Sequence, residues 1–361
     1  MLIKILSLQA KMINRVLKSI PTIKSSLSER AFFVFSSNVD NDFTTITVNQ
    51  GYFCLRFDVS CVVKEGGTCT IPQDVLLRVF STMHGDISID AKTETVTISN
   101  SEGYSVQLPK MPVPDIPQPD CQKLVCTFQK SQMEFLQVLN KCKLQSTKCE
   151  VSFGQSGFLQ GADGYHIIQY GYRTANDMVY SILPMILPMM HVLFSEGCEV
   201  WKGEWTLNFR NKAAILSVHL LPTAIPVSFP IPETDSVSVS VAELKQALSR
   251  ISPVSLHKGK ISTTTSVKME TVEKTLVFTV DSDNYFGSIN TVYTQSVAIA
   301  CSGELSTALY INLDYLNDVL SAASATELTL IPDGINICNF ISGAMSSRVG
   351  LMQKPRKENA A

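Results

Sequence analysis

Apolar residues recur with the period of an α-helix in three well-separated segments of similar length. In each segment the apolar positions fall at i, i+3 or i+4, and i+7: residues 10–20 (AKMINRVLKSI), 131–142 (SQMEFLQVLNKC) and 241–251 (VAELKQALSRI). This spacing predicts three amphipathic helices. Leu17, Leu139 and Leu248 occupy matching places in them, which indicates an internal repeat.

A second pattern also occurs three times, namely an apolar run followed by a residue that suits a helix start. Its copies are residues 70–86 (TIPQDVLLRVFSTMHGD), 181–197 (SILPMILPMMHVLFSEG) and 309–324 (LYINLDYLNDVLSAAS). Pro72, Pro184 and Asn312 match, and proline and asparagine both favour helix starts. Each copy therefore predicts a strand and then a helix. On this basis the uncharged run 178–194 is a strand with a buried helix, and not a membrane span.

A third pattern predicts hairpins and further strands. Three strand–turn–strand segments align on Tyr52, Tyr165 and Tyr285: residues 47–59, 159–172 and 278–292. Alternating apolar and polar residues predict additional strands at 87–99, 199–209 and 327–340. The predicted fold class is α+β, with helices and antiparallel strands in each repeat.

Proline-rich stretches at 106–120 and 218–235 separate the repeats. Because proline restricts the backbone and disfavours helix before it, these stretches are expected to be short, stiff linkers. The 361 residues then divide into three domains, 1–120, 121–234 and 235–361. Domains of this size are ordinary for globular proteins.

Composition narrows the class of protein without identifying it. Net charge is −2, 45% of residues are hydrophobic and 17% are charged, so the chain is globular and its total charge neither indicates nor excludes nucleic acid. The ten Cys include no C-x-x-C and the five His are scattered, which argues against a zinc site and favours reduced, buried thiols. The charged N-terminal segment does not resemble a signal peptide and there is no N-x-S/T sequon. We therefore expect an intracellular, cytoplasmic protein without a zinc site.

The stretch 161–167 (GADGYHI) admits two interpretations. Asp163 and His166 could be half of a catalytic dyad, or Asp163 could form a hairpin turn that exposes one ring. No G-x-G-x-x-G, P-loop, H-E-x-x-H or G-x-S-x-G motif accompanies them, and the repeat favours a turn with Gly164 as its flexible residue. Residues 281–284 (DSDN) are likewise predicted to be a turn, since Phe286 stands where a calcium loop needs glycine. An enzyme is not expected.

With the triplication established, the chain resembles the bacterial β sliding clamps, the processivity clamps of DNA replication. The hairpin GADGYHI is similar to the family's Thr-Asp-Gly-His-Arg-Leu, with Ala162, Tyr165, His166 and Ile167 as departures. The segment YINLDYLNDVL resembles the family's Phe-Asn-x-x-Tyr-Leu-x-x-x-Leu helix, and VGLMQKPR resembles its C-terminal Val-Val-Met-Pro-Met-Arg. The resemblance extends over essentially the whole chain.

The resemblance implies a fold and a function. It implies three tandem clamp domains per chain, and two chains closing head to tail into a ring with sheets outside and helices lining the hole. Such a ring holds double-stranded DNA without sequence preference and tethers DNA polymerase, while a separate ATP-driven loader places it on DNA. The clamp itself needs no cofactor and has no membrane partner.

The resemblance also implies two sets of site residues. Basic residues of the helices would face DNA: Lys11, Arg15, Lys18, Arg78, Lys141, Lys143, Lys245 and Arg250. An apolar pocket for polymerase and clamp-loader peptides would be lined by Ala162, Gly164, Tyr165, His166, Ile167, Pro226, Ile231, Tyr315, Leu351, Met352, Gln353 and Lys354. Alternatively, the basic residues belong to ordinary solvated helix faces. The pocket residues could likewise do no more than pack a junction between domains.

Several features leave an alternative function open. Asp314 and Asp318 oppose a uniformly positive bore, so the chain could be a clamp-fold peptide-binding adaptor that does not encircle DNA. His166 replaces the family's arginine, and Gln353 with Lys354 replaces its Pro-Met. These departures predict a partner peptide that differs from the family's usual one.

Overall fold

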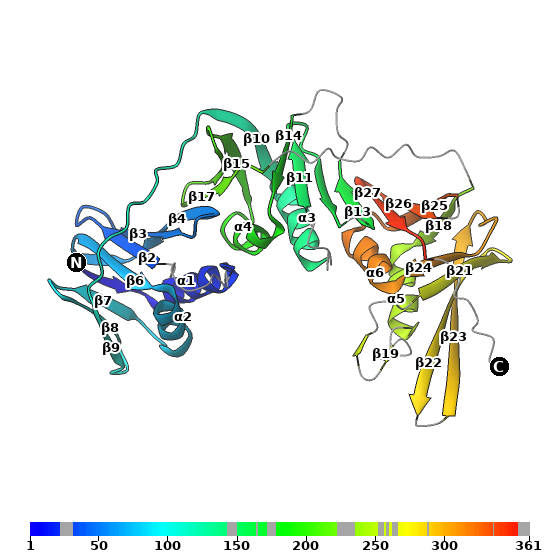
Figure 1. The fold of residues 1–361 in the computed structure, drawn as a ribbon, viewed down its shortest axis with the longest axis horizontal. Helices are drawn as coiled ribbons and strands as arrows, with labels where there is room; N and C mark the ends of the chain where they lie inside the picture. Colours follow the sequence, from blue (N-terminus) through cyan, green and yellow to red (C-terminus); the bar gives the residue numbers. More distant parts are fainter. Residues whose placement is uncertain are drawn as a thin grey trace. The chain divides into compact units, whose positions relative to one another are not determined.

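The computed structural model of the chain describes residues 1–21, 32–142, 150–163, 165–171, 178–221, 235–251, 256–257, 260–261, 266–286, 289–334 and 336–352 (Figure 1). Its contacts divide the chain into two compact units. Unit 1 comprises Met1–Glu134 and Met185–Pro222, and unit 2 comprises Phe135–Pro184 and Thr223–Ala361. Each unit combines helices with antiparallel sheet. The predicted domain boundaries near 121 and 234 remain predictions.

All the predicted helices are present. The described part of the chain contains six α-helices: α1 (Ser7–Ser19), α2 (Gln73–Thr82), α3 (Lys130–Lys141), α4 (Leu187–Leu193), α5 (Val241–Ile251) and α6 (Leu313–Ala322). In α1 the apolar face is buried through Ala10, Ile13, Val16 and Leu17, as the helical spacing predicted.

The helix starts follow the residues that predicted them. Pro72 is the N-cap of α2, and Pro184 opens a 3₁₀ turn (Pro184–Ile186) before α4. Asn312 caps α6, because its side-chain Oδ1 accepts a hydrogen bond of 2.8 Å from the backbone N–H of Asp314. Within the described ranges no helix is long and apolar enough to cross a membrane.

The described residues of unit 1 form two antiparallel sheets. The order of the five-stranded sheet is β5 (Val62–Glu65), β1 (Leu2–Ile5), β7 (Ile87–Ala91), β8 (Thr95–Asn100) and β9 (Ser105–Pro109). The order of the eight-stranded sheet is β10 (Lys123–Gln129), β15 (Gly197–Lys202), β16 (Thr206–Arg210), β17 (Ala214–His219), β4 (Phe53–Ser60), β3 (Phe43–Asn49), β2 (Phe32–Ser37) and β6 (Gly67–Pro72). The proline-rich stretch after β9 forms neither helix nor strand, as expected of a linker.

In unit 2 the residues that the structure describes form one large antiparallel sheet and a small hairpin. The order of its twelve strands is β14 (Val179–Ile182), β11 (Glu150–Gly154), β12 (Leu159–Ala162), β13 (His166–Tyr170), β27 (Met345–Gly350), β26 (Ile337–Ser342), β25 (Glu327–Asp333), β18 (Val237–Ser240), β23 (Ile289–Ser302), β22 (Thr275–Phe286), β21 (Ser266–Val272) and β24 (Leu309–Asn312). The hairpin pairs β19 (Leu256–His257) with β20 (Lys260–Ile261).

The strand order repeats three times, which confirms the triplication. A first ladder of four strands occurs as β1-β7-β8-β9, as β10-β15-β16-β17 and as β18-β25-β26-β27. A second ladder occurs as β4-β3-β2-β6, as β13-β12-β11-β14 and as β23-β22-β21-β24. Each repeat therefore contributes one ladder of each kind and two helices.

The ladders of successive repeats join edge to edge. The last strand of a first ladder pairs with the first strand of the preceding repeat's second ladder, as β17 does with β4 and β27 with β13. Two described strands in equivalent positions remain without such a pairing. They are β9, the last strand of the first repeat's first ladder, and β23, the first strand of the third repeat's second ladder. Among the described strands β9 pairs only with β8, and β23 pairs with β22 and, through Cys301 and Ser302, with β18. One edge of each is therefore open.

One predicted turn is wrong. Residues 281–284 lie inside β22, where Asp281 to Asn284 pair with Thr294 to Thr291, and the reversal comes between Phe286 and Ile289. The ladder continues because the opposing stretch from Ile289 to Thr294 is rich in β-branched residues, which favour strand. Tyr285 consequently lies in a strand, whereas Tyr52 and Tyr165 lie at turns.

The cysteines behave largely as predicted. The nine cysteines in the described ranges are free thiols, six of them buried. Burial, with the nearby Asp42 carboxylate, raises the pKa of Cys61 to about 11. Burial raises the pKa of Cys69 to about 12. Thiols held protonated in this way are unreactive small core residues.

Candidate functional site

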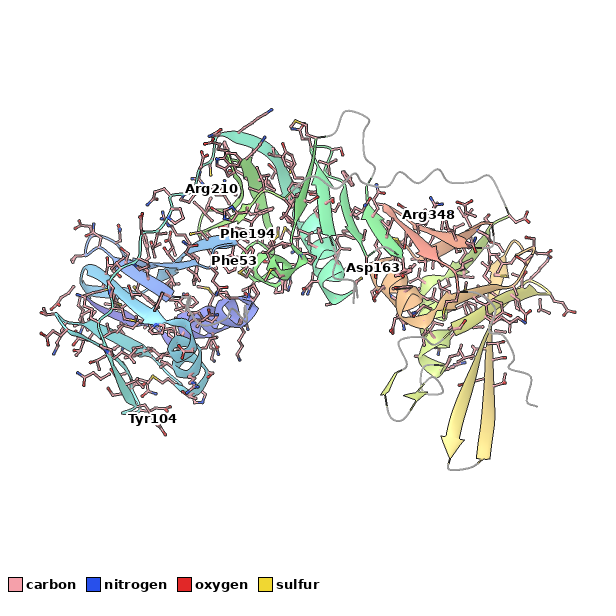
Figure 2. The ribbon with its side chains drawn as sticks, viewed as in Figure 1. Phe53, Tyr104, Asp163, Phe194, Arg210 and Arg348 are labelled. Atoms are coloured by element: carbon pink, nitrogen blue, oxygen red, sulfur yellow. The ribbon has the colours of Figure 1, made fainter. Side chains whose placement is uncertain are left out.

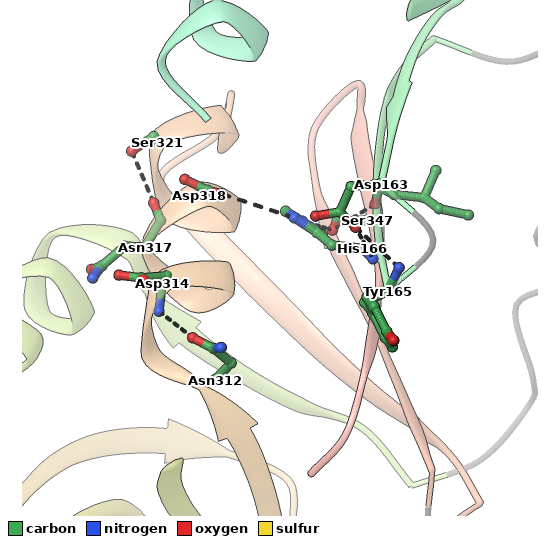
Figure 3. Close-up of polar contacts among 10 residues, drawn as sticks. Asp163, Tyr165, His166, Asn312, Asp314, Asn317, Asp318, Ser321 and Ser347 are labelled. Carbon is green, nitrogen blue, oxygen red and sulfur yellow. Dashed lines mark hydrogen bonds and ion pairs between the residues drawn. The ribbon is translucent and has the colours of Figure 1, made fainter. Parts of the chain in front are cut away.

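The hairpin between β12 and β13 in unit 2 is shaped by Asp163 (Figures 2 and 3). Its Oδ1 accepts hydrogen bonds from the backbone N–H groups of Tyr165 (3.0 Å) and His166 (2.9 Å). Its own N–H donates to the carbonyl of His166 (3.1 Å). These three bonds confirm that Asp163 forms the turn. Gly164 lies outside the described residues.

Replacing Asp163 with alanine is expected to lower the free energy of unfolding of unit 2 by about 2 kcal/mol, because one buried and one partly buried N–H group lose a charged acceptor. Asp163→Asn is the matched control, since its amide oxygen can accept both bonds. Urea denaturation followed by circular dichroism measures the difference. Equal destabilisation of the two variants would show that the turn does not depend on this acceptor.

His166 is fully buried, with 0% of its surface exposed. The Ser347 hydroxyl donates a hydrogen bond to the carbonyl of Ile167 (2.9 Å). Its Oγ therefore accepts a hydrogen bond from His166 Nε2 (3.2 Å). Burial lowers the pKa of His166 to about 4, against a smaller raising effect of Asp163. His166 Nδ1 lies 4.0 Å from Asp318 Oδ2. Because the ring is neutral near pH 7, this contact is not an ion pair at that pH.

This burial corrects part of the sequence interpretation. The exposed ring at the turn is Tyr165, with 73% of its surface exposed, and not His166. His166 packs beneath the surface against Tyr315 of α6, with ring centroids 5.1 Å apart and planes inclined at 42°. His166 therefore packs against Tyr315 and does not itself line an open surface.

Tyr315 connects the hairpin to α6. It is half-buried, and burial together with the acidic neighbours Asp163, Tyr165, Asp318 and Asp314 raises the pKa of its phenol to about 12. Its hydroxyl therefore remains a hydrogen-bond donor at neutral pH. Figure 3 shows Asp318 on the face of α6 that is turned toward His166.

The last described residues meet the same hairpin. Gly350 N donates to the carbonyl of Tyr165 (2.8 Å), and Met352 N donates to the carbonyl of Tyr310 (2.8 Å), just before α6. Leu351 and Met352 are half-buried. The structure thus brings together the hairpin (Ala162, Tyr165, His166 and Ile167), Tyr315, Leu351 and Met352.

Some predicted site residues cannot be placed, and two relevant residues were not predicted. Pro226, Ile231, Gln353, Lys354 and the basic Lys143 lie outside the described residues, as does Gly164. Ser347 shares a hydrogen bond with His166 and Asp318 lies beside its ring, but neither residue was assigned to the pocket. The i, i+3 spacing of Tyr315 and Asp318 could have indicated Asp318, whereas nothing in the sequence indicated Ser347.

The predicted basic residues lie on exposed helix faces. Within the described ranges all seven are exposed and none forms an ion pair: Lys11, Arg15, Lys18, Arg78, Lys141, Lys245 and Arg250. The first three occupy one face of α1, opposite its buried residues. In unit 1 this helix packs against α2 and α4.

Solved structures share this fold over nearly the whole chain. The β clamp of Helicobacter pylori bound to a DNA ligase peptide has a TM-score of 0.78 at 15% identity, covering 98% of this chain and 100% of that one. The DNA polymerase III β subunit of Thermotoga maritima has a TM-score of 0.73 at 16% identity, with 98% and 100% covered. That of Pseudomonas aeruginosa has 0.73 at 12%, with the same coverage.

Sequence comparison alone finds no such similarity, since no protein-family model and no curated protein sequence matches the chain. The structural likeness confirms the predicted fold, an α+β chain of three tandem clamp-type repeats.

Proposed function

We propose that this chain, which has the fold of the bacterial β clamps, is a DNA sliding clamp that encircles duplex DNA and tethers a DNA polymerase. The observation that carries the proposal is the pair of open edges on β9 and β23. Two of the three equivalent junctions are closed inside the chain, by β17 with β4 and by β27 with β13. The third junction lacks a partner within the described strands.

A second copy of the chain would supply the missing partner. Its β9 would pair with β23 of the first copy, and the first copy's β9 with its β23, both antiparallel like the two internal junctions. A head-to-tail contact of this kind produces a ring when the rotation closes. It would also cover edges that otherwise invite aggregation: Thr294, Ser296, Ala298 and Ala300 of β23 are exposed, as are alternate residues of β9.

Exposed basic helix faces would hold the DNA. Lys11, Arg15 and Lys18 follow one face of α1 and form no ion pair among the described residues, so they are available to phosphates. Contacts to phosphates do not depend on base sequence and exchange rapidly, which suits a protein that slides.

The triple variant K11Q/R15Q/K18Q is expected to bind duplex DNA more weakly and with a weaker dependence on salt. Each lost phosphate contact removes about 0.9 from the slope of log affinity against log salt concentration, so the loss is about 2 to 3. Fluorescence anisotropy of a labelled duplex, recorded between about 50 and 200 mM salt, measures this slope. Lys64→Gln, on the exposed strand β5, is the control. An unchanged slope in the triple variant would remove α1 from the DNA interface.

The surface around Tyr165, Tyr315, Leu351 and Met352 would receive short peptides from the polymerase and the clamp loader. It combines an exposed aromatic ring with half-buried apolar residues, which suits apolar peptide anchors. The Helicobacter pylori clamp is described with a DNA ligase peptide bound, which supports peptide recognition by this fold. The clamp would act without catalysis or a cofactor, in the cytoplasm, with ATP hydrolysis left to the loader.

Measurement of the oligomer tests this proposal. Multi-angle light scattering at micromolar concentration is expected to give twice the 39.7 kDa of one chain. Negative-stain images of the same sample are expected to show closed rings. A monomer, or an open chain of subunits, would contradict the proposal and favour the adaptor function instead.

A further inference from the structure

The turn between β3 and β4 in unit 1 corresponds to the turn at Asp163 in unit 2. Gln50 N donates a hydrogen bond to the carbonyl of Phe53 (3.0 Å), and in unit 2 the equivalent bond runs from Asp163 to His166. The strand after each turn pairs with the last strand of the following repeat, β4 with β17 and β13 with β27 (Figure 1). The exposed tyrosine just before β13 thus has a counterpart in Tyr52, just before β4.

The ends of β17 and β27 also make the same contacts. Each end donates two backbone hydrogen bonds, one to the tyrosine of the turn and one to the loop between the second and third strands of its own ladder. These bonds are His219 N to Tyr52 O (3.2 Å) and Leu220 N to Trp205 O (2.9 Å) after β17, and Gly350 N to Tyr165 O (2.8 Å) and Leu351 N to Asn336 O (2.7 Å) after β27. The repeat therefore gives unit 1 a copy of the backbone that carries the proposed peptide surface of unit 2.

Two large aromatic side chains are exposed on this part of unit 1. Trp205 has 72% of its surface exposed and Tyr52 has 57%. Leu220 and Leu221, which follow β17, are half-buried. Tryptophan and tyrosine are over-represented among the residues that carry most of the binding energy of interfaces. We call these four residues, Tyr52, Trp205, Leu220 and Leu221, the Trp205 surface.

The turn that carries Trp205 is held in place by Asp120, at the end of the first proline-rich linker. Asp120 Oδ2 accepts a hydrogen bond from Glu204 N (2.8 Å), and the carbonyl of Asp120 accepts one from the side chain of the buried Asn208 (2.6 Å). Together with the bond from the end of β17, the turn is fixed at three points. A ligand would therefore have little backbone to order on binding, which lowers the entropic cost.

Two unpaired carboxylates meet at this turn. Asp120 and Glu204 are exposed, and neither forms an ion pair within the part of the chain that the structure describes. Lys123 and Lys202 lie opposite each other in the nearby ladder of β10 and β15, and they form no ion pair with these carboxylates. Among aromatic side chains tryptophan attracts cations most strongly through its ring face. The carboxylates and the ring of Trp205 thus complement a positive charge.

We infer that the Trp205 surface is a second peptide-docking site, which binds a short segment of a partner protein that has a lysine or arginine next to an aromatic or aliphatic residue. The cation lies on the ring of Trp205 close to Glu204, and the apolar residue packs against Tyr52. The role of this partner in DNA replication rests on the proposed function, whereas the chemistry of the surface does not. One chain can then hold two partner segments at the same time.

Selection from a library of short random peptides tests the inference. Phage that display the library are first depleted on the Y52A/W205A variant, which removes the peptides that bind any other surface, and are then selected on the full wild-type chain. The enriched peptides are expected to have a basic residue next to an apolar one. Failure to enrich any peptide above the depleted background would overturn the inference.

Tryptophan fluorescence shows where an enriched peptide binds. The sequence has two tryptophans, so the Trp201→Phe variant leaves Trp205 as the only reporter. A synthetic copy of the peptide is expected to shift the emission of Trp205 to shorter wavelength, because the ring leaves water. A shift that follows protein concentration without any peptide would show that a second copy of the chain covers the surface, and would contradict the inference.

Substitutions test the chemistry of the partner. Tyr52→Ala is expected to weaken the peptide at least about tenfold. Glu204→Gln is expected to weaken it about threefold, the usual size of an exposed ion pair. Tyr104→Ala removes another exposed ring of unit 1 and is expected to change nothing, as is Lys202→Gln. Circular dichroism establishes that each variant is folded.

Two results of these substitutions would overturn the inference. Weaker binding by Lys202→Gln, with unchanged binding by Glu204→Gln, would show that the partner segment is acidic. Unchanged binding by Tyr52→Ala would show that the peptide lies elsewhere. None of these outcomes depends on whether the chain encircles DNA, so the inference and the proposed function can fail separately.

Discussion

The Gln107→Pro variant is expected to fold normally and to fail to close a ring. Asn100 N donates a hydrogen bond to the carbonyl of Tyr104, and Lys110 N donates one to the carbonyl of Glu94. The backbone N–H and C=O groups of the even-numbered residues of β9 therefore point toward β8. The N–H of Gln107 consequently points to the open edge. Proline is tolerated on an edge strand whose N–H faces solvent, but it removes a donor and obstructs an incoming strand. The expected loss is about 3 kcal/mol, on the order of a hundredfold in the dissociation constant of the ring.

Sedimentation at several protein concentrations measures that dissociation constant. Gln107→Thr is the matched control, because threonine keeps the N–H and favours strand. An unchanged circular-dichroism spectrum and melting temperature would establish that the proline variant is folded. A folded Q107P protein that still forms rings with wild-type affinity would exclude β9 from the interface.

Lowering the pH from 7.5 to 4.5 is expected to destabilise unit 2 through His166. Its pKa is about 4 in the folded protein and about 6.5 in the unfolded chain, so the unfolded state binds the proton first. Above pH 6.5 the ring is neutral in both the folded and the unfolded state, so unit 2 has its full stability there. This stability decreases progressively as the pH falls from 6.5 toward 4, by up to about 3 kcal/mol.

Hydrogen exchange of the β13 and β27 amides, corrected for its intrinsic dependence on pH, measures this loss within unit 2. The His166→Gln variant should lack the pH-dependent part, since glutamine can still donate to Ser347 but does not titrate. His84→Gln is the control, because His84 is exposed in unit 1. If lowering the pH reduces the protection of the β13 amides no more in the wild type than in the His166→Gln variant, the assigned burial of His166 is contradicted.

The elements that sequence predicted well are those whose local chemistry agrees with their place in the fold. The helical spacing of α1 and the cap at Asn312 are local features, and the structure confirms both. The turn at 281–284 failed because Asp and Asn are common in turns, whereas the pairing of β22 with β23 extends through them. Strand pairing depends on residues far apart in sequence, which turn propensity does not include.

The candidate site shows the same division. The turn at Asp163 could be predicted because it is local: the hydrogen-bond partners of Asp163, Tyr165 and His166, lie within three residues of it. The burial of His166 was not predicted, since it depends on Ser347 from a strand 181 residues away and on Tyr315 of α6. Sequence alone also did not show that two strand edges remain open, because that follows from the complete strand order.

Retention on DNA of defined topology tests the central proposal most directly. The protein would be reassembled from dissociated protomers in the presence of nicked circular duplex, so that no loader is required, and then passed through a sizing column at high salt. A sliding clamp is expected to elute with the circle and to be released when a restriction enzyme linearises it. Equal retention on circular and linear DNA, or none on either, would contradict the proposal that this chain closes around the duplex.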